Sequence, residues 1–299
     1  MSNKYLILIA SIYGILIKAL CSLKIIRPNR GVNNCVRGKK IVVSLTSYGR
    51  RVSKTVGYTV ISLLRQTYQP DEIILWLDNV NWNDNNIPPL LRELTKYGLT
   101  ICFCEDIKSY KKLIPTLKHR PDSLIITTDD DVYYRNDTIE RLVNHYIENP
   151  KMIYCHTAHG VKLNSNNTIA DYSEWEEDVN GTSSRFVFPV GEGCVLYDPS
   201  LLYKDITNES LFLKLAPLAD DVWFYFMELL NNTECCQLCR KHRIPYMPLD
   251  MLYQHFHKGS SLRNNNVDEN MNDKQIQNIV NYYRIEFDAN QQVLLPNCI

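Results

Sequence analysis

The chain has 299 residues, of which 45% are hydrophobic, so it is long enough to bury a substantial core. Its 33 basic and 33 acidic residues cancel, which argues against a surface that binds nucleic acid. Ten cysteines without a regular spacing favour reduced core thiols over a disulfide framework. The tightest group, Cys235, Cys236 and Cys239, lacks the second pair that a zinc site needs.

An apolar segment runs from Tyr5 to Leu23 and is interrupted by Lys18. A cleaved signal peptide fits poorly, because Lys18 lies where the apolar core should pass to a cleavage site. Basic residues flank the segment on both sides, namely Lys4, Lys24, Arg27 and Arg30. We predict a hydrophobic, membrane-associating helix over residues 1–30, which either spans the membrane or lies in its interface. The alternative is a helix packed on the protein's own core.

Strand and helix patterns alternate after this segment. Continuous apolar runs at residues 40–45, 72–77, 99–104 and 123–128 predict four strands. Between the first two, apolar residues recur at helical spacing, at Val56, Val60, Leu63 and Leu64. Strand, helix and strand in about 40 residues form a βαβ unit, which implies a parallel sheet.

The second half of the chain continues the alternation. The pattern predicts a helix over residues 137–150, with Asp137 as its cap, and another over residues 218–231. Residues 151–158 and 185–199 read as strands, the second interrupted by Gly191 and Gly193. We expect residues 244–257 to be irregular or extended and residues 272–287 to form a terminal amphipathic helix. The expected organisation is one domain over residues 38–262 with a helical extension over residues 263–299.

Three adjacent aspartates, Asp129, Asp130 and Asp131, follow the fourth predicted strand. In an extended segment Asp129 and Asp131 share one face, where each raises the pKa of the other unless a cation neutralises them. Hard divalent ions such as Mg²⁺ and Mn²⁺ prefer oxygen ligands, and ligands of open α/β sheets bind at the carboxyl ends of the strands. The motif therefore predicts a divalent-cation site, with a solvated acidic turn as the alternative.

Five segments occur together in an order that marks a family: "TSYGRR", "SYKKLIPTL", "TTDDDVYY", "GEGCVLYDP" and "ADDVWF". Through them, residues 39–258 resemble glycosyltransferases of the GT-A fold, and more narrowly the family-2-like bacterial enzymes that build capsular or lipopolysaccharide glycans. The resemblance implies an α/β, Rossmann-like, mostly parallel sheet flanked by helices.

The resemblance also implies roles for individual residues. Asp129 and Asp131 match the motif that holds Mn²⁺ or Mg²⁺ on the donor diphosphate, and some enzymes of this fold add a late histidine, here His257. An ordinary packing or surface role is the alternative for His257. The donor-binding positions that the resemblance implies are Thr46, Arg50, Asp78, Lys111, Lys112, Asp130, Gly191 and Gly193. For the two lysines, a solvated helix face is the alternative, and Arg51 is a further candidate for the phosphates.

Asp220 and Asp221 match the position where inverting members of this fold carry the catalytic base. Acids in the first turn of a helix also favour the helix dipole and cap its N-terminus. We expect one of the pair to cap and the other to react, and we favour Asp221 as the base over Asp220.

The sequence thus predicts a metal-dependent, inverting glycosyltransferase that moves a sugar from a nucleotide-diphosphate sugar to a glycan or lipid-linked acceptor. Its expected location is the cytoplasmic face of a bacterial inner membrane, in surface polysaccharide synthesis. Two alternatives remain: a nucleotidyltransferase of related sheet architecture, and a non-catalytic, membrane-anchored protein that binds nucleotide sugars.

Overall fold

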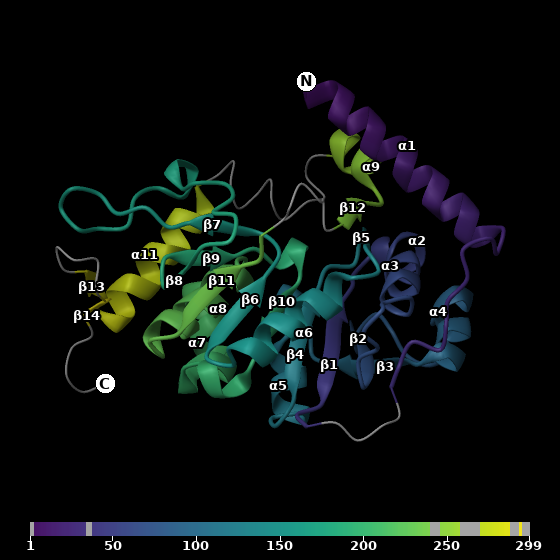
Figure 1. The fold of residues 1–299 in the computed structure, drawn as a ribbon, viewed down its shortest axis with the longest axis horizontal. Helices are drawn as coiled ribbons and strands as arrows, with labels where there is room; N and C mark the ends of the chain where they lie inside the picture. The colour runs from purple at the N-terminus through teal and green to yellow at the C-terminus, as the bar shows by residue number, and fades with distance from the viewer. Residues whose placement is uncertain (1–2, 34–37, 240–245, 258–269, 288–292, 295–299) are drawn as a thin grey trace.

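An eight-stranded sheet, in the order β3-β2-β1-β4-β10-β6-β11-β8, forms the centre of the computed structural model, which describes residues 3–33, 38–239, 246–257, 270–287 and 293–294 (Figure 1). β1 pairs in parallel with β2 and β4, β2 with β3, and β6 with β11, whereas β10 is antiparallel to β4 and β6, and β8 to β11. The strands of this sheet are β1 (Ile41–Thr46), β2 (Glu72–Asp78), β3 (Leu99–Cys104), β4 (Leu124–Thr128), β6 (Met152–Cys155), β8 (Ser183–Ser184), β10 (Val195–Tyr197) and β11 (Glu234–Gln237). This confirms the predicted mostly parallel sheet.

Helices cover both faces of the sheet. One apolar core lies between the sheet and α3, α4 and α6, and the other between the sheet and α5, α7, α8 and α11. The bounds of the α-helices are α1 (Asn3–Ser22), α2 (Arg51–Lys54), α3 (Val56–Leu63), α4 (Pro89–Leu94), α5 (Ile114–His119), α6 (Thr138–Glu148), α7 (Glu209–Leu215), α8 (Asp220–Leu230), α9 (Met251–Phe256) and α11 (Met271–Tyr283). The four residues predicted to form the inner face of α3 are all buried.

Small two-stranded sheets border the central one. β5 (Val132–Tyr134) follows the acidic triplet and pairs with β12 (Tyr246–Pro248), while β7 (Ala158–Gly160) pairs with β9 (Val187–Pro189). β13 (Glu286–Phe287) pairs with β14 (Val293–Leu294). β12 leads directly into α9, so two segments that the sequence separates by more than a hundred residues meet beside the triplet.

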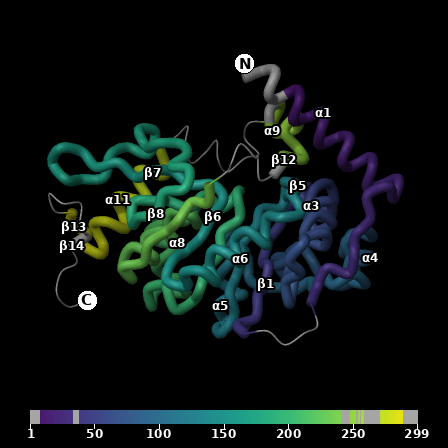
Figure 2. Tube along the Cα trace, in the orientation of Figure 1, coloured from purple at the N-terminus to yellow at the C-terminus, as the bar shows by residue number. Residues whose placement is uncertain are grey.

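The segment at residues 244–257 differs from the sequence expectation. Its described part begins with the short strand β12, which is extended as expected, but continues as the helix α9, which the sequence did not lead us to expect. α9 and β12 pack against α1 at one edge of the molecule, as both traces show (Figures 1 and 2). Tertiary contact with α1 supports this short helix, which the local sequence pattern does not announce.

α1 itself has two different faces. Ile17 and Cys21 are buried in the core that also contains α3, so part of the core-packing alternative is correct. The opposite face is apolar and exposed, at Leu8, Ile9, Ile12, Ile15 and Leu16. Within the described part of the chain, no helix combines the length and apolarity that a membrane crossing requires.

Candidate active site

A cavity of about 660 Å³ opens at the carboxyl ends of β1 and β4. Thr46, the last residue of β1, and Asp129, Asp130 and Asp131, which follow β4, line one side. β1 and β4 are parallel neighbours, so their carboxyl ends lie at the same edge of the sheet, which explains why the triplet and the end of β1 meet there. The acidic triplet therefore lies where the sequence predicts, inside a concave site.

The three aspartates differ in their surroundings. Asp130 is buried, accepts a hydrogen bond from Ser47 and pairs with Arg51 at 3.0 Å. Asp131 also pairs with Arg51, at 3.1 Å, and accepts a hydrogen bond of 2.6 Å from Gln254 Nε2. Burial raises the pKa of Asp131 to about 7, although Arg51 opposes this shift. Asp129, with 32% of its side chain exposed, is the most open to the cavity.

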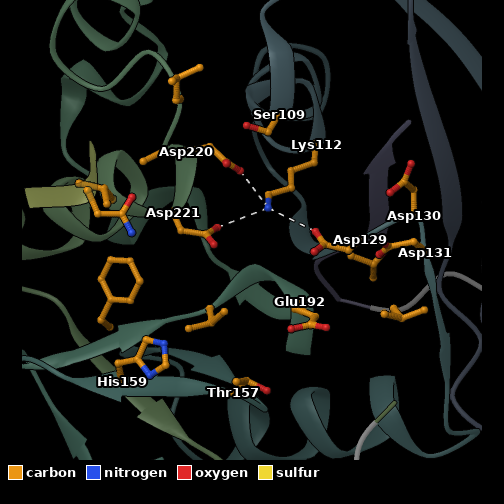
Figure 3. Close-up of a pocket in the computed structure, with 18 of the residues that line it drawn as sticks. Ser109, Lys112, Asp129, Asp130, Asp131, Thr157, His159, Glu192, Asp220 and Asp221 are labelled. Atoms are coloured by element: carbon orange, nitrogen blue, oxygen red, sulfur yellow. Dashed lines mark hydrogen bonds and ion pairs between the residues drawn. The ribbon is translucent and has the colours of Figure 1, made fainter. Parts of the chain in front are cut away.

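Lys112 lies between the two acidic groups of the cavity (Figure 3). Its Nζ is 3.5 Å from Asp129 Oδ1, 2.9 Å from Asp220 Oδ2 and 3.3 Å from Asp221 Oδ1. Burial lowers the pKa of Lys112, but the carboxylates of Asp220, Asp221 and Asp129 outweigh burial and raise that pKa well above its ordinary value. Lys112 is therefore a fixed positive charge between the triplet and the start of α8.

Asp220 and Asp221 occupy the first turn of α8 but do not cap it. The N-cap residue is Ala219, and no side chain bonds to the free N–H groups there, so the capping prediction is wrong. Asp220 is the more enclosed, with 10% of its side chain exposed against 28% for Asp221. Burial raises the pKa of Asp221 to about 6, opposed by Lys112. Asp221 is therefore ionised at neutral pH and open to the cavity, as a general base requires.

Gly191 and Gly193 lie in a 3₁₀ turn (Gly191–Gly193) between β9 and β10. The Gly191 N–H donates a hydrogen bond of 3.1 Å to Asp221 Oδ2. A Cβ at residue 191 would lie 2.5 Å from Lys112 Nζ and 2.8 Å from Asp221 Oδ1, and one at residue 193 would meet Thr157. The glycines thus make room for protein side chains, whereas the sequence led us to expect room for the ligand.

The structure separates the other predicted donor-binding residues into two groups. Thr46, Lys112 and Asp130 line the cavity. Asp78 is buried and accepts hydrogen bonds from Asn81, and Lys111 is buried and pairs with Asp106. Arg50 pairs with Asp250, and its guanidinium group lies 3.8 Å from the centre of the Tyr253 ring. These three are not among the described residues that line the cavity. Neither lysine lies on a solvated helix face.

His257 is not brought to Asp129 and Asp131. It is exposed at the end of α9, stacks on Tyr253, and lines a second cavity together with Lys18 and Arg50. Among the described residues, no three histidine, cysteine, aspartate or glutamate side chains converge as a metal cluster. The described cysteines are free thiols, as the sequence predicts.

Sequence reasoning missed several residues of the cavity. Gln254, Glu192, His159, Tyr172 and Asn272 all line it, and they come from segments far apart in the chain. Glu192 lies within the segment "GEGCVLYDP", but no local motif distinguishes the other four. Arg51 was considered beside Arg50, and the structure places Arg51, not Arg50, against the triplet.

Comparison with known proteins gives a family and several distant structural likenesses. Residues 43–211 match glycosyl transferase family 2, which is more than half of the chain. No curated protein sequence matches. Residues 1–349 of TarS from S. aureus, in complex with UDP-GlcNAc, are 15% identical with a TM-score of 0.45, covering 69% of this chain and 57% of that one. The chain thus spans less than two thirds of this TarS structure.

Two further structures are more distant. The mannosyltransferase PcManGT from Pyrobaculum calidifontis, in complex with GDP-Man and Mn²⁺, is 14% identical with a TM-score of 0.33, covering 50% of this chain and 46% of that one. The CMP:2-keto-3-deoxy-manno-octonic acid synthetase, complexed with CTP, is 11% identical with a TM-score of 0.40, covering 67% and 89%. The family match decides against the nucleotidyltransferase alternative. The chain belongs to glycosyl transferase family 2.

Proposed function

We propose that this glycosyltransferase moves a sugar, with inversion, from a nucleotide-diphosphate sugar to a glycan or lipid-linked acceptor. The observation that carries the proposal is the division of one cavity into two acidic sides joined by Lys112. The triplet side lies at the strand ends and suits the diphosphate, while Asp221 faces the same space from α8. A single displacement needs this arrangement, because the base and the leaving group act on opposite sides of the sugar.

The reaction follows from these positions. The acceptor hydroxyl oxygen attacks the anomeric carbon and forms the new glycosidic bond, and Asp221 takes the hydroxyl proton. The bond between the anomeric carbon and the diphosphate oxygen breaks, and its electron pair leaves with the nucleoside diphosphate. Lys112 holds Asp221 in place and contributes positive charge beside the leaving group.

The charge of the cavity supports dependence on a divalent cation. Of the described residues that line the cavity, two are cationic, Arg51 and Lys112, and seven carry carboxylates, namely Asp129, Asp130, Asp131, Glu177, Glu192, Asp220 and Asp221. A diphosphate adds further negative charge, which such a site accepts only with a counter-ion.

The side chains present suit that ion. Mg²⁺ is commonly held by one or two carboxylates together with substrate phosphates, so a cluster of three protein ligands is not required. Asp129 and Asp131 would hold the cation, and Glu192 lies on the same cavity. When bound, the cation would neutralise charge on the leaving diphosphate.

We further propose that the exposed face of α1 lies in a membrane interface, on the cytoplasmic side of a bacterial inner membrane, where the enzyme serves surface polysaccharide synthesis. The apolar side chains of this face are 51–60% exposed for Ile9, Ile12, Ile15 and Leu16, and the basic residues Lys24, Arg27 and Arg30 follow it. An apolar face with basic residues beside it binds surfaces that contain anionic lipids.

The donor experiment tests the proposed activity. A panel of nucleotide-diphosphate sugars is incubated with the full-length protein and Mn²⁺, and release of the nucleoside diphosphate is followed with and without EDTA. We expect one donor to be hydrolysed slowly, with EDTA abolishing the release. NMR of the transfer product then gives the anomeric configuration. No hydrolysis of any donor, or hydrolysis that EDTA leaves unchanged, contradicts the proposed activity or its metal dependence, respectively.

A further inference from the structure

The side of the cavity beyond Asp221 is lined by four rings, which we call the aromatic wall: His159, Tyr172, Trp175 and Phe188. The ring centres of Tyr172 and Trp175 are 4.8 Å apart, those of Trp175 and Phe188 are 5.3 Å apart, and those of His159 and Tyr172 are 5.6 Å apart. Trp175 and Phe188 are buried, and the indole N–H of Trp175 donates to the carbonyl of Ala170. They form a fixed base on which the half-buried Tyr172 and His159 face the cavity.

α11 fixes the position of this wall. The Tyr172 N–H donates a hydrogen bond of 2.7 Å to Asp273 Oδ1, and the Leu218 N–H donates one of 2.8 Å to Gln275 Oε1. One helix end is thus bonded both to the aromatic wall and to the segment that leads to Asp220. The wall and the proposed base therefore have a common support.

The same helix end presents a polar group to the cavity. Asn272 lines the cavity and is 8% exposed, and its Oδ1 has no hydrogen-bond partner among the described residues. A buried amide oxygen without a donor is unfavourable, so an isolated one beside a cavity indicates a ligand that supplies the donor. A hydroxyl group has the right chemistry, since an amide oxygen only accepts.

Charge narrows the class of ligand. Glu177, two residues after Trp175, also lines the cavity, as do Asp220 and Asp221. The two cationic lining residues are both engaged elsewhere, Arg51 with the triplet and Lys112 between the two acidic groups. Figure 3 shows His159 on the side of Asp221, away from Asp130 and Asp131. A phosphate or carboxylate here would meet carboxylates with no free cation among the described lining residues.

We propose that the aromatic wall binds the acceptor, and that the acceptor's terminal unit is a neutral pyranose. The C–H face of the sugar ring packs on Tyr172 beside His159, one hydroxyl donates to Asn272 Oδ1, and another reaches Asp221. Aromatic faces with a few placed polar groups fix the orientation of such a ligand. The inference rests on the proposed function, because it takes Asp221 as the base, and it excludes acidic sugars and polyol phosphates as preferred acceptors.

A binding experiment that needs no donor tests this inference. Saturation-transfer NMR is recorded on the full-length protein with methyl glycosides of glucose, galactose and N-acetylglucosamine, and separately with methyl glucuronide and glycerol 3-phosphate. We expect saturation transfer to the ring protons of at least one neutral glycoside, and weaker or no transfer to the two anions. Tyr172→Ala and Asn272→Ala should each weaken that binding about tenfold, as loss of a buried contact of this kind does.

Matched controls come from α11 itself. Tyr282 is 45% exposed and Asn281 is exposed, and neither lines the cavity, so Tyr282→Ala and Asn281→Ala should bind the glycoside as the wild type does. Tyr172→Phe keeps the ring and should retain binding. Thermal unfolding of each variant confirms that it is folded.

The outcomes separate this inference from the proposed function. Failure of every neutral glycoside to bind, preference for glucuronide or glycerol phosphate, or unchanged binding in both Tyr172→Ala and Asn272→Ala overturns the inference. If the donor panel shows hydrolysis in that case, the proposed function stands. Conversely, wall-dependent binding of a neutral glycoside without hydrolysis of any donor supports the inference and counts against the proposed function.

Discussion

The ammonium group of Lys112 lies 3.3 Å from Asp221 Oδ1, and this ion pair joins the two acidic sides of the cavity. The same ammonium is 3.5 Å from Asp129. A change in charge at the triplet therefore acts on Asp221, the proposed base, through the side chain of Lys112.

The assignment of the base is tested first. Asp221→Asn should lower transfer on the order of 10²–10⁴-fold, the usual loss for a positioned base, while donor affinity is kept. Asp220→Asn should act mainly on stability, by about 1–3 kcal/mol, because it removes an enclosed partner of Lys112. Initial rates, donor calorimetry and thermal unfolding separate the two. An inactive but stable Asp220→Asn beside an active Asp221→Asn reverses the assignment.

The pKa of Asp221 predicts a pH dependence. Burial raises this pKa to about 6, and a base acts only when deprotonated, so kcat/KM should fall as the pH drops through about 6. Lys112 lowers the pKa of Asp221, and therefore Lys112→Met should move this fall in kcat/KM, the acid limb of the rate profile, to higher pH. Lys112→Arg keeps the charge and should leave the limb near its place. Rate profiles from about pH 5 to about pH 8 test this. Identical limbs in wild type and Lys112→Met contradict it.

Asp131 is the test of the metal site. Asp131→Asn replaces a carboxylate by a neutral amide, which keeps one oxygen but loses the negative charge. Mn²⁺-linked binding of UDP or other candidate nucleotides should therefore be lost while the fold survives. Asp122→Asn, at an exposed loop position, is the matched control and should bind as the wild type does. Calorimetry with Mn²⁺ and with EDTA gives both affinities. Unchanged Mn²⁺-linked binding in folded Asp131→Asn places the cation elsewhere.

A methyl group at residue 191 should displace both the proposed base and Lys112. In Gly191→Ala the new Cβ would crowd Lys112 Nζ and Asp221 Oδ1, so both must shift. Displacement of a reacting group by about 1 Å costs on the order of 10²-fold in rate. Gly38→Ala is the control, since a Cβ there meets no atom within 4 Å. Full activity in Gly191→Ala would show that Asp221 need not hold its present position.

The exposed face of α1 is tested with lipid vesicles. Ile12 and Leu16 are 57% and 51% exposed, so Ile12→Ser with Leu16→Ser should spare the fold and weaken binding to anionic vesicles by at least about tenfold. Ile147→Ser, on the exposed side of α6, is the control. Vesicle flotation measures the bound fraction. If the wild type stays with the soluble fraction, the face serves another purpose.

The strands and the acidic residues at their ends were accessible from the sequence, because apolar β-branched runs with sharp polar ends determine both the element and the place where it stops. β4 and Asp129 follow from that reasoning alone, as does the position of Asp221 at the start of α8. The end of β4 and the start of α8 are determined by the local sequence, so they can be predicted from it.

The sequence could not predict that neighbouring residues of the same type would lie in different environments. Lys111 and Lys112 are adjacent and chemically identical, yet a 3₁₀ turn directs Lys111 to Asp106 and Lys112 to the cavity. Likewise Arg51 rather than Arg50 pairs with the triplet, whereas Arg50 pairs with Asp250, directly before α9. Tyr172 and Asn272 reach the same cavity because the Tyr172 N–H bonds to Asp273, the residue after Asn272 and 101 positions from Tyr172. No periodicity in the sequence encodes this contact.

The ion pair between Lys18 and Asp250 joins residues 232 positions apart. At about 5–20 residues per second, a ribosome needs roughly 10–50 s to make the chain between them. For that time α1 exists without β12 and α9, and the surface they later cover is open together with its apolar outer face. During this interval another apolar surface can bind α1 before β12 and α9 do. Gln254, which is part of α9, completes the contacts of Asp131 only afterwards.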